Sequence, residues 1–198
     1  MKLFHKIITS IMLVAFSTSL SLAAPTPTNI KEQSPQGIYL SAVETYDLVK
    51  KDANKILFID VRTPYELVFV GSTPMMDKNI PFTLVSAKKW DEKRKSYAGE
   101  LNKNFVKDVE TALKAKGLSK KDQIIFMCRS GSRSLKATKL MAKAGYMNVA
   151  TVVDGFEGGK DKKYKQRTTN TGWKNTCPAN SWGYKNYKEK MYFPKEKI

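Results

Sequence analysis

Along the chain, unbroken apolar runs of strand length alternate with stretches in which apolar residues recur every three or four positions. An unbroken run is typical of a strand that a parallel sheet buries on both faces, and the wider spacing is typical of an amphipathic helix. The predicted strands are Lys55–Val61, Ile124–Met127 and Val149–Val153. Strands that alternate with helices predict an α/β domain with a mostly parallel central sheet flanked by helices on both faces.

Two helix starts have clear capping signals. Ser41 is followed three residues later by Glu44, which predicts a capping box for a helix that ends near residue 51. Thr63 and Pro64 predict the N-cap and first residue of a short helix. The remaining predictions are helices over 101–115 and 135–145 and an irregular segment over 71–81.

The N-terminus has the layout of a secretory signal peptide over residues 1–23. Lys2 and Lys6 precede an apolar run that ends in small residues, and cleavage is expected after Ala23. The alternative interpretation is an uncleaved membrane anchor. Cleavage would leave a periplasmic or secreted protein with no stable membrane insertion.

Three segments are expected after the signal. Residues 24–37 contain three prolines and no aromatic residue, and they are expected to form a flexible leader. The folded domain is expected over 38–178. A basic, aromatic C-terminal extension over 179–198 is expected to pack back on the domain, because a disordered tail seldom has so many aromatic residues.

The formal net charge is +17, and 30 of the 35 basic residues are lysine. Lysine is a strongly hydrated point charge, whereas phosphate and base recognition relies on the planar arginine group. We therefore interpret the charge as a solvated surface and expect no nucleic-acid partner. The excess of basic and aromatic residues in the last part of the chain is compatible with binding of an unidentified protein partner.

The inventory of reactive side chains is small. The single histidine, His5, lies in the signal segment, and the two cysteines are Cys128 and Cys177. Two cysteines cannot form a disulfide framework or a four-ligand zinc site. Without a histidine in the mature chain, a Ser-His-Asp triad, a Cys-His pair and a His-ligated metal are all excluded. We expect no metal and no cofactor.

Cys128 is the candidate nucleophile, because it ends a predicted buried strand and a turn and a helix follow it. In a parallel sheet, ligands bind where strands end and helices begin. A tight loop at this place aims backbone N–H groups and the positive end of a helix dipole at one point, which stabilises a thiolate. The loop continues through Arg129, Ser130, Gly131, Ser132 and Arg133. Its two arginines are candidate ligands for an anion.

These residues resemble the rhodanese family of sulfurtransferases over about residues 38–178. The matching motifs, in chain order, are DVRTPYE at 60–66, NIP at 79–81, CRSGSR at 128–133, VVDGFEGG at 152–159 and GW at 172–173. The resemblance implies a rhodanese-like fold and transfer of a sulfane sulfur through a Cys128 persulfide. The donor would be thiosulfate or another small anionic persulfide donor, and the acceptor a thiol or cyanide.

The loop length favours sulfur over phosphate or arsenate. Related phosphatases and arsenate reductases place seven residues from Cys to Arg, whereas Cys128 to Arg133 is six. In the implied mechanism Arg129 and Arg133 mainly bind the anionic donor, and the loop N–H groups hold the persulfide. Asp60, Arg62 and Glu66 are expected to be structural supports, with an Arg62–Glu66 pair that fixes the following helix.

The chain departs from the family pattern at several places, among them an unusual stretch over 75–78. Ser72 stands where many members have histidine, residues 160–171 form an insertion, and Cys177 stands where an apolar residue is usual. Cys177 is either a small buried hydrophobic residue or a redox partner of Cys128. Two other functions therefore stay open. One is a thiol–disulfide or arsenate-type reductase that uses both cysteines, and the other is a non-catalytic rhodanese-like module that binds a partner.

Overall fold

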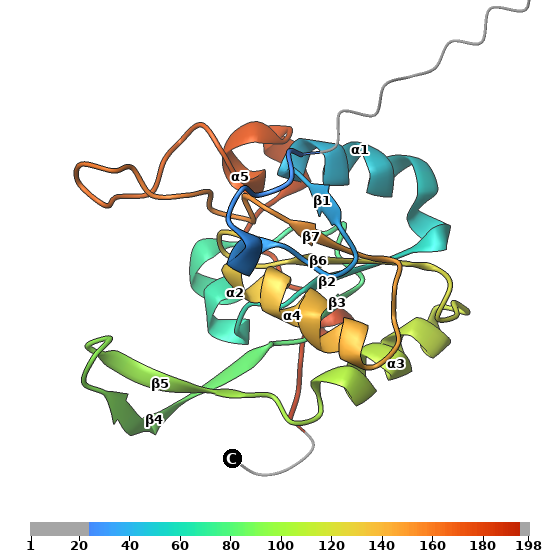
Figure 1. Cartoon of the computed structure of the whole chain (residues 1–198), viewed down its shortest axis with the longest axis horizontal. Helices are drawn as coiled ribbons and strands as arrows, with labels where there is room; N and C mark the ends of the chain where they lie inside the picture. The colour runs from blue at the N-terminus through green and yellow to red at the C-terminus, as the bar shows by residue number, and fades with distance from the viewer. Residues whose placement is uncertain (1–23, 195–198) are drawn as a thin grey trace, which may run out of the picture.

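The computed structural model describes residues 24–194, so the predicted signal peptide lies outside the described residues. Its centre is a five-stranded parallel sheet in the order β1-β7-β6-β2-β3 (Figure 1). The strands, in this spatial order, are Ile38–Leu40, Val149–Val152, Gln123–Met127, Ile56–Asp60 and Lys78–Asn79. The parallel sheet confirms the predicted fold class. Within residues 24–194, no helix has the length and apolarity needed to cross a bilayer.

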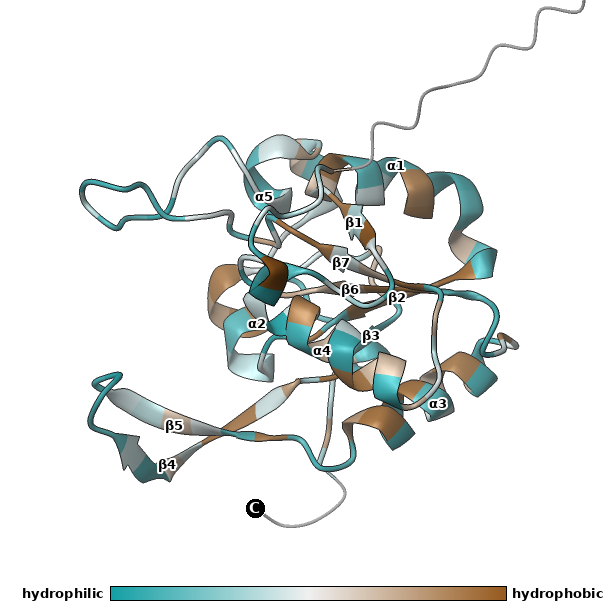
Figure 2. Ribbon diagram, in the orientation of Figure 1, coloured by the Kyte–Doolittle hydropathy of each residue, from teal (hydrophilic) through white to brown (hydrophobic). Residues whose placement is uncertain are grey.

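Helices cover both faces of the sheet, and each face has its own apolar core (Figure 2). Alternate residues of β2 and β6 enter opposite cores because successive side chains of a strand point to opposite faces. One core lies under α3 (Phe105–Ala115) and α4 (Ser132–Lys143). The other lies under α1 (Ala42–Asp52), α2 (Pro64–Val70) and α5 (Trp173–Thr176).

The capping box predicted at Ser41 is present, and the predicted N-cap Thr63 forms a second one. Ser41 Oγ accepts from the N–H of Glu44 at 3.2 Å, and Thr63 Oγ1 accepts from the N–H of Glu66 at 3.3 Å. In each case the glutamate carboxylate accepts the N-cap backbone N–H in return. The two helices therefore begin where the sequence predicted, and α2 holds Glu66 at the carboxyl edge of the sheet.

A β-hairpin was missed by the sequence analysis. Strands β4 (Thr83–Asp91) and β5 (Ser96–Leu101) pair with each other in an antiparallel ribbon that extends away from the domain (Figure 1). Most of its side chains are exposed, so the ribbon lacks the apolar alternation of a half-buried strand. The helix predicted over 101–115 consequently begins at Phe105. The segment predicted to be irregular also contains the short strand β3.

Part of the segment predicted to be a flexible leader packs on the domain. A short 3-10 helix forms at Ile30–Glu32, and Ser34 is buried. The Gln36 side chain donates hydrogen bonds to the carbonyls of Thr138 and Tyr146, at 2.9 and 3.1 Å. The proline content suggested a free linker, but these contacts fix the segment against the end of α4.

The C-terminal part of the chain runs back over the domain as far as residue 194. Gly183 forms two backbone hydrogen bonds with Ser72, and the Ser72 hydroxyl donates to Asn186 at 3.1 Å. Trp182 packs on the core under α5. Ser72, one of the departures from the family pattern, is therefore a buried attachment point for this extension. The remaining short helices are 3-10 turns at Ala53–Lys55, Ala179–Ser181 and Lys188–Lys190.

Candidate active site

Cys128 lies directly after β6 and is fully buried. The loop that follows runs into α4, whose N-cap is Gly131. Gly131 has φ +91°, and a Cβ there would lie 2.2 Å from the carbonyl oxygen of Val153. Only glycine fits this position, because backbone occupies the space and the conformation is left-handed. The sequence therefore places a twelve-residue helix with its positive end toward the cysteine loop.

A turn after β7 braces the cysteine loop from the other side. Phe156 N–H donates to the Cys128 carbonyl at 2.8 Å, and Glu157 N–H donates to the Arg129 carbonyl at 2.9 Å. A Cβ on Gly155 would lie 2.6 Å from the Cys128 carbonyl oxygen. The VVDGFEGG motif thus holds the backbone of the cysteine loop by direct contact.

Ser134 is a site residue that the sequence analysis did not identify. Its hydroxyl lies 3.5 Å from Cys128 Sγ and accepts a hydrogen bond from Thr151 Oγ1 at 2.9 Å. It also lies 2.8 Å from the Gly131 carbonyl and 3.4 Å from the Val152 carbonyl, so its one proton is shared among these two oxygens and the sulfur. The sequence feature that could have identified Ser134 is its position in the first turn of the helix that follows the cysteine loop.

Arg133 forms a bidentate pair with Glu66. The two nitrogen–oxygen distances are 2.7 and 2.5 Å, and both side chains are mostly buried. Burial would raise the pKa of Glu66, but hydrogen bonds and charge from Arg133, with hydrogen bonds from Thr63, outweigh it and lower the pKa to about 2. The pair ties the cysteine loop to the first turn of α2.

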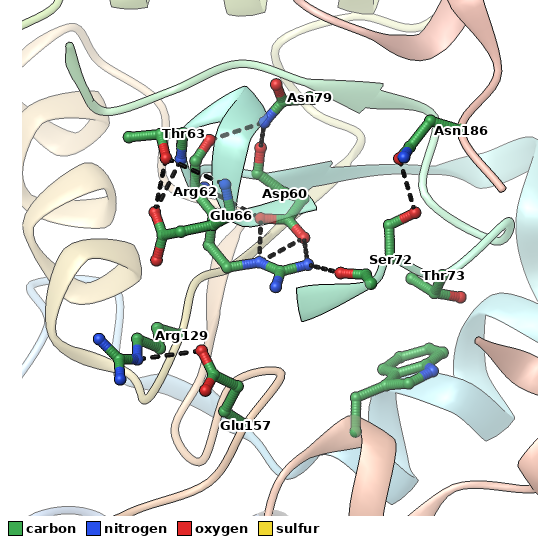
Figure 3. A network of polar contacts seen from close by, with 12 residues as sticks. Asp60, Arg62, Thr63, Glu66, Ser72, Thr73, Asn79, Arg129, Glu157 and Asn186 are labelled. Atoms are coloured by element: carbon green, nitrogen blue, oxygen red, sulfur yellow. Dashed lines mark hydrogen bonds and ion pairs between the residues drawn. The ribbon is translucent and has the colours of Figure 1, made fainter. Parts of the chain in front are cut away.

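The expected Arg62–Glu66 pair was wrong. Arg62 instead pairs with Asp60, at 2.7 Å between Nη2 and Oδ2, and both side chains are fully buried (Figure 3). Arg62 also donates to the Gly71 carbonyl at 3.0 Å, and its guanidinium lies 4.0 Å from the centre of the Phe156 ring. The short sequence separation of Asp60 and Arg62 allows this closer pairing and leaves Glu66 free for Arg133. The supporting role of these groups is therefore a link between β2, the end of α2 and the turn after β7.

Arg129 is the more exposed of the two loop arginines, with 44% of its side chain accessible. It forms an ion pair with Glu157, which is drawn in Figure 3. The distance between Arg129 Nε and Glu157 Oε1 is 3.0 Å. Arg167, from the inserted segment, approaches the same carboxylate, with 3.9 Å between its Nε and Glu157 Oε2. The two arginines therefore share one acidic partner at the edge of the cysteine loop.

A pocket of about 470 Å³ lies beside the same loop. Its walls include the loop residues Ser130, Gly131 and Ser132, the α4 lysines Lys136 and Lys139, and part of the leader segment. Cys128 is not among the lining residues. The backbone of the predicted site residues 130–132 therefore separates this basic pocket from the buried sulfur.

Cys177 lies on the other face of the sheet from Cys128. Cys128 belongs to the core under α3 and α4, whereas Cys177 belongs to the core under α1, α2 and α5. Both are free thiols, and burial raises the pKa of Cys177 to about 12. This geometry gives no support to a redox pair and places Cys177 as a small buried hydrophobic residue.

The arrangement suits nucleophilic chemistry at sulfur. Over residues 24–194, no group of three His, Cys, Asp or Glu side chains is placed to hold a metal ion. The Ser134 hydroxyl contacts Cys128 Sγ, the N-terminus of α4 follows the cysteine loop, and the loop carries Arg129 and Arg133. These groups favour an anionic sulfur and an anionic ligand, since each carries a full or partial positive charge or a donor hydrogen.

Comparison with known proteins identifies the same domain family as the sequence motifs do. The model of the rhodanese-like domain family matches residues 41–162. An uncharacterized protein of Rickettsia prowazekii is 32% identical over 128 residues, which are 64% of this chain and 90% of that protein. Rhodanese-like domain-containing protein 17 of Arabidopsis thaliana is 29% identical over 109 residues, or 54% of this chain and 60% of that protein.

A solved structure shares the fold. The crystal structure of Rv0390 from M. tuberculosis matches with a TM-score of 0.54 and 22% sequence identity. The match covers 74% of this chain and 97% of that protein. This chain therefore resembles that protein in the fold of the domain.

Proposed function

The chain belongs to the family of rhodanese-like domains, and on that premise we propose that it is a sulfurtransferase that acts through a persulfide on Cys128. The observation that carries the proposal is the position of Cys128 at the end of β6, in a six-residue loop that leads into the N-terminus of α4. A sulfane sulfur needs no general base for attack by a thiolate. This suits a site in which the side chain hydrogen-bonded to the sulfur is a hydroxyl rather than an imidazole.

The proposed reaction has two balanced steps. With thiosulfate as donor, the Cys128 thiolate attacks the outer sulfur and forms an S–S bond, the original S–S bond breaks, and sulfite leaves with the bonding electron pair. The enzyme then carries a Cys128 persulfide anion. An acceptor thiolate or cyanide attacks the outer sulfur of that persulfide, and the Cys128 thiolate is restored.

Each group around Cys128 has a defined part in this proposal. The N–H groups of the loop and the N-terminus of α4 stabilise the persulfide anion. Ser134 donates to sulfur in the charged state, when its bond to the Gly131 carbonyl is exchanged for one to Sγ. Arg129 faces the donor, whereas Arg133 holds the loop through Glu66, because its guanidinium is already engaged by two short contacts.

The proposed location rests on the predicted signal peptide over residues 1–23. We propose a periplasmic or secreted protein on the basis of the basic start, the apolar run and the small residues before Ala24. In such a compartment the donor and acceptor would be small sulfur compounds or the thiols of exported proteins.

A steady-state assay with thiosulfate and cyanide tests the activity. The full protein should form thiocyanate and sulfite in equal amounts, and Cys128→Ser should form neither. Cys177→Ala is the matched control, because it removes the other thiol and leaves the cysteine loop untouched. Activity retained by Cys128→Ser, or lost only in Cys177→Ala, would contradict the proposal.

A further inference from the structure

The β4–β5 ribbon has one apolar side, which we call the apolar ribbon face. Trp90 lies directly opposite Tyr97 in the antiparallel ladder. Val85 lies directly opposite Gly99, and Leu101 follows two positions further along β5. Directly opposed residues share a face, and so do residues two positions apart on one strand. The apolar ribbon face therefore consists of Val85, Trp90, Tyr97 and Leu101.

A β-bulge brings Trp90 to this face. Val85 and Trp90 are an odd number of positions apart, so they would point to opposite faces of a regular strand. The register shifts between these two residues, and the extra residues of β4 return Trp90 to the side of Val85. The same irregularity interrupts the apolar alternation of β4, so this face is visible only in the structure.

The apolar ribbon face is exposed. Its four residues are 43–55% exposed, and all four lie outside the two apolar cores. The rings of Trp90 and Tyr97 contact each other edge to face, with 5.5 Å between their centroids. The ribbon extends away from the domain, as Figure 1 shows. An isolated two-stranded ribbon has no core of its own, so burial of this face against a partner would stabilise it.

The ribbon also has a surplus of positive charge. Each of its acidic side chains forms an ion pair with a basic side chain of the ribbon, in the pairs Asp91–Arg94, Glu92–Lys95 and Glu100–Lys89. Lys88 and Lys93 are exposed and form no ion pair with any residue of the described part of the chain. Because the chain has a net charge of +17, two copies repel each other and an anionic surface is the favoured partner.

The residue types favour a lipid surface over a protein surface. Tryptophan and tyrosine are enriched where the headgroups of a bilayer meet its acyl chains. Lysine is depleted at protein–protein interfaces, whereas beside a membrane its long stem lets the ammonium group reach the headgroups. Both unpaired cations of the ribbon are lysines. An apolar face flanked by basic residues is typical of a segment that lies in a membrane interface.

We propose that the apolar ribbon face binds the surface of an anionic lipid bilayer. Trp90 and Tyr97 enter the headgroup region, and Lys88 and Lys93 interact with anionic headgroups. The protein lies on the bilayer and does not cross it. The inference goes beyond the proposed sulfur transfer and does not depend on it, because the ribbon contains none of the groups around Cys128.

Co-sedimentation with lipid vesicles tests the inference on the chain that begins at Ala24. This form is used because the apolar segment over 1–23 would itself bind lipid, and both apolar cores lie within residues 24–194. Wild-type protein should bind vesicles of phosphatidylglycerol and phosphatidylcholine at low salt, bind pure phosphatidylcholine much more weakly, and be released by high salt. Wild-type protein that binds neither kind of vesicle would overturn the inference and leave the face to a protein partner.

The double substitution Trp90→Ser and Tyr97→Ser should weaken binding to the anionic vesicles at least about tenfold, because two aromatic rings no longer enter the bilayer. Its thermal unfolding should stay close to that of the wild type, since the ribbon lies outside both cores. Tyr164→Ser is the matched control, because Tyr164 is an exposed aromatic residue beside Lys163 on a different loop. Equal binding by wild type and the double variant would contradict the inference.

Tryptophan emission measures the same contact in the unchanged protein. Of the three tryptophans, Trp173 is buried, Trp182 is partly buried and Trp90 is exposed. Anionic vesicles should shift the emission of wild-type protein to shorter wavelength. Trp90→Phe keeps an aromatic ring and should bind the vesicles without this shift. A shift that persists in Trp90→Phe would count against the inference.

Sedimentation equilibrium without lipid tests the remaining occupant, a second copy of the chain. Wild type and the double variant should both be monomers. A wild-type dimer that the double substitution dissociates would show that a second copy covers the apolar ribbon face, and it would overturn the inference.

Discussion

Arg133 of the cysteine loop and Glu66 of α2 form a bidentate ion pair, with nitrogen–oxygen distances of 2.7 and 2.5 Å. The two residues are 67 positions apart in the sequence, and both side chains are 21% exposed. Their contact joins the loop that carries the nucleophile to the capping box of a neighbouring helix. The loop geometry therefore depends on a group outside the cysteine motif.

This pair should make stability depend on pH. The folded-state pKa of Glu66 is about 2, against 4.5 for an ordinary glutamate, so the unfolded state binds a proton first as the pH falls. The pair thus stabilises the fold above about pH 5, and this contribution is lost as the pH falls toward 2. Glu66→Gln should lower the free energy of unfolding at neutral pH by on the order of 3 kcal/mol.

Urea denaturation of both proteins at several pH values measures this difference. The gap between wild type and Glu66→Gln should close as the pH falls through the carboxylate range. Glu100→Gln is the control, because its pair with Lys89 is on the exposed hairpin and should have no measurable effect. A gap that is independent of pH would contradict the assigned pairing.

Gly155→Ala should destabilise the protein strongly. A Cβ at this position would lie 2.6 Å from the backbone of both Cys128 and Ser130, and φ is +64°. The cost should be at least about 2 kcal/mol, since a left-handed conformation and a backbone clash add. Gly159→Ala has nothing within 4 Å of the new Cβ and should be nearly neutral. Thermal unfolding monitored by circular dichroism would compare the two, and similar melting temperatures would count against the close contact.

Ser134→Ala should slow the first chemical step. The substitution removes the hydroxyl that lies 3.5 Å from Cys128 Sγ. The rate of sulfite release in a single turnover should fall about fivefold, the effect of one weak hydrogen bond to a charged group. Thr138→Ala, on the same helix, removes a hydroxyl bonded to the Leu135 carbonyl and should leave the rate unchanged. Equal rates in wild type and Ser134→Ala would remove Ser134 from the mechanism.

The thiol of Cys177 should be unreactive in the folded protein. Its pKa of about 12 keeps the thiol protonated at neutral pH, and it lies in the core on the opposite face of the sheet from Cys128. After treatment with a mild oxidant, peptide mapping without reduction should find no disulfide between the two cysteines. Detection of that disulfide in folded protein would restore the reductase interpretation.

The sequence predicted most of the sheet and helices because those elements carry local signals. The capping boxes at Ser41 and Thr63 use residues three positions apart, so their partners are visible in the sequence. Asp60 and Glu66 are both close to Arg62 in the sequence, and the prediction of Glu66 was wrong because Arg133, 67 positions away, takes that carboxylate. The exposed β4–β5 ribbon has no core face, so its hydrophobic pattern carries no strand signal.

The candidate site was likewise only partly predictable. The cysteine loop is a continuous segment, and its residues were found from their order. Ser134 and Glu157 act through contacts with that loop, and Arg167 belongs to an insertion with no motif of its own. These residues become visible only when the turn after β7 is packed on the cysteine loop, since that packing brings together segments that are far apart in the chain.

The central claim is that Cys128 carries the transferred sulfur. The most direct test is the intact mass of the full protein after incubation with thiosulfate and removal of excess donor, followed by peptide mapping. The account predicts a gain of one sulfur atom, located on Cys128, released by cyanide and absent from Cys128→Ser. An unchanged mass, or a sulfur located on Cys177, would contradict it.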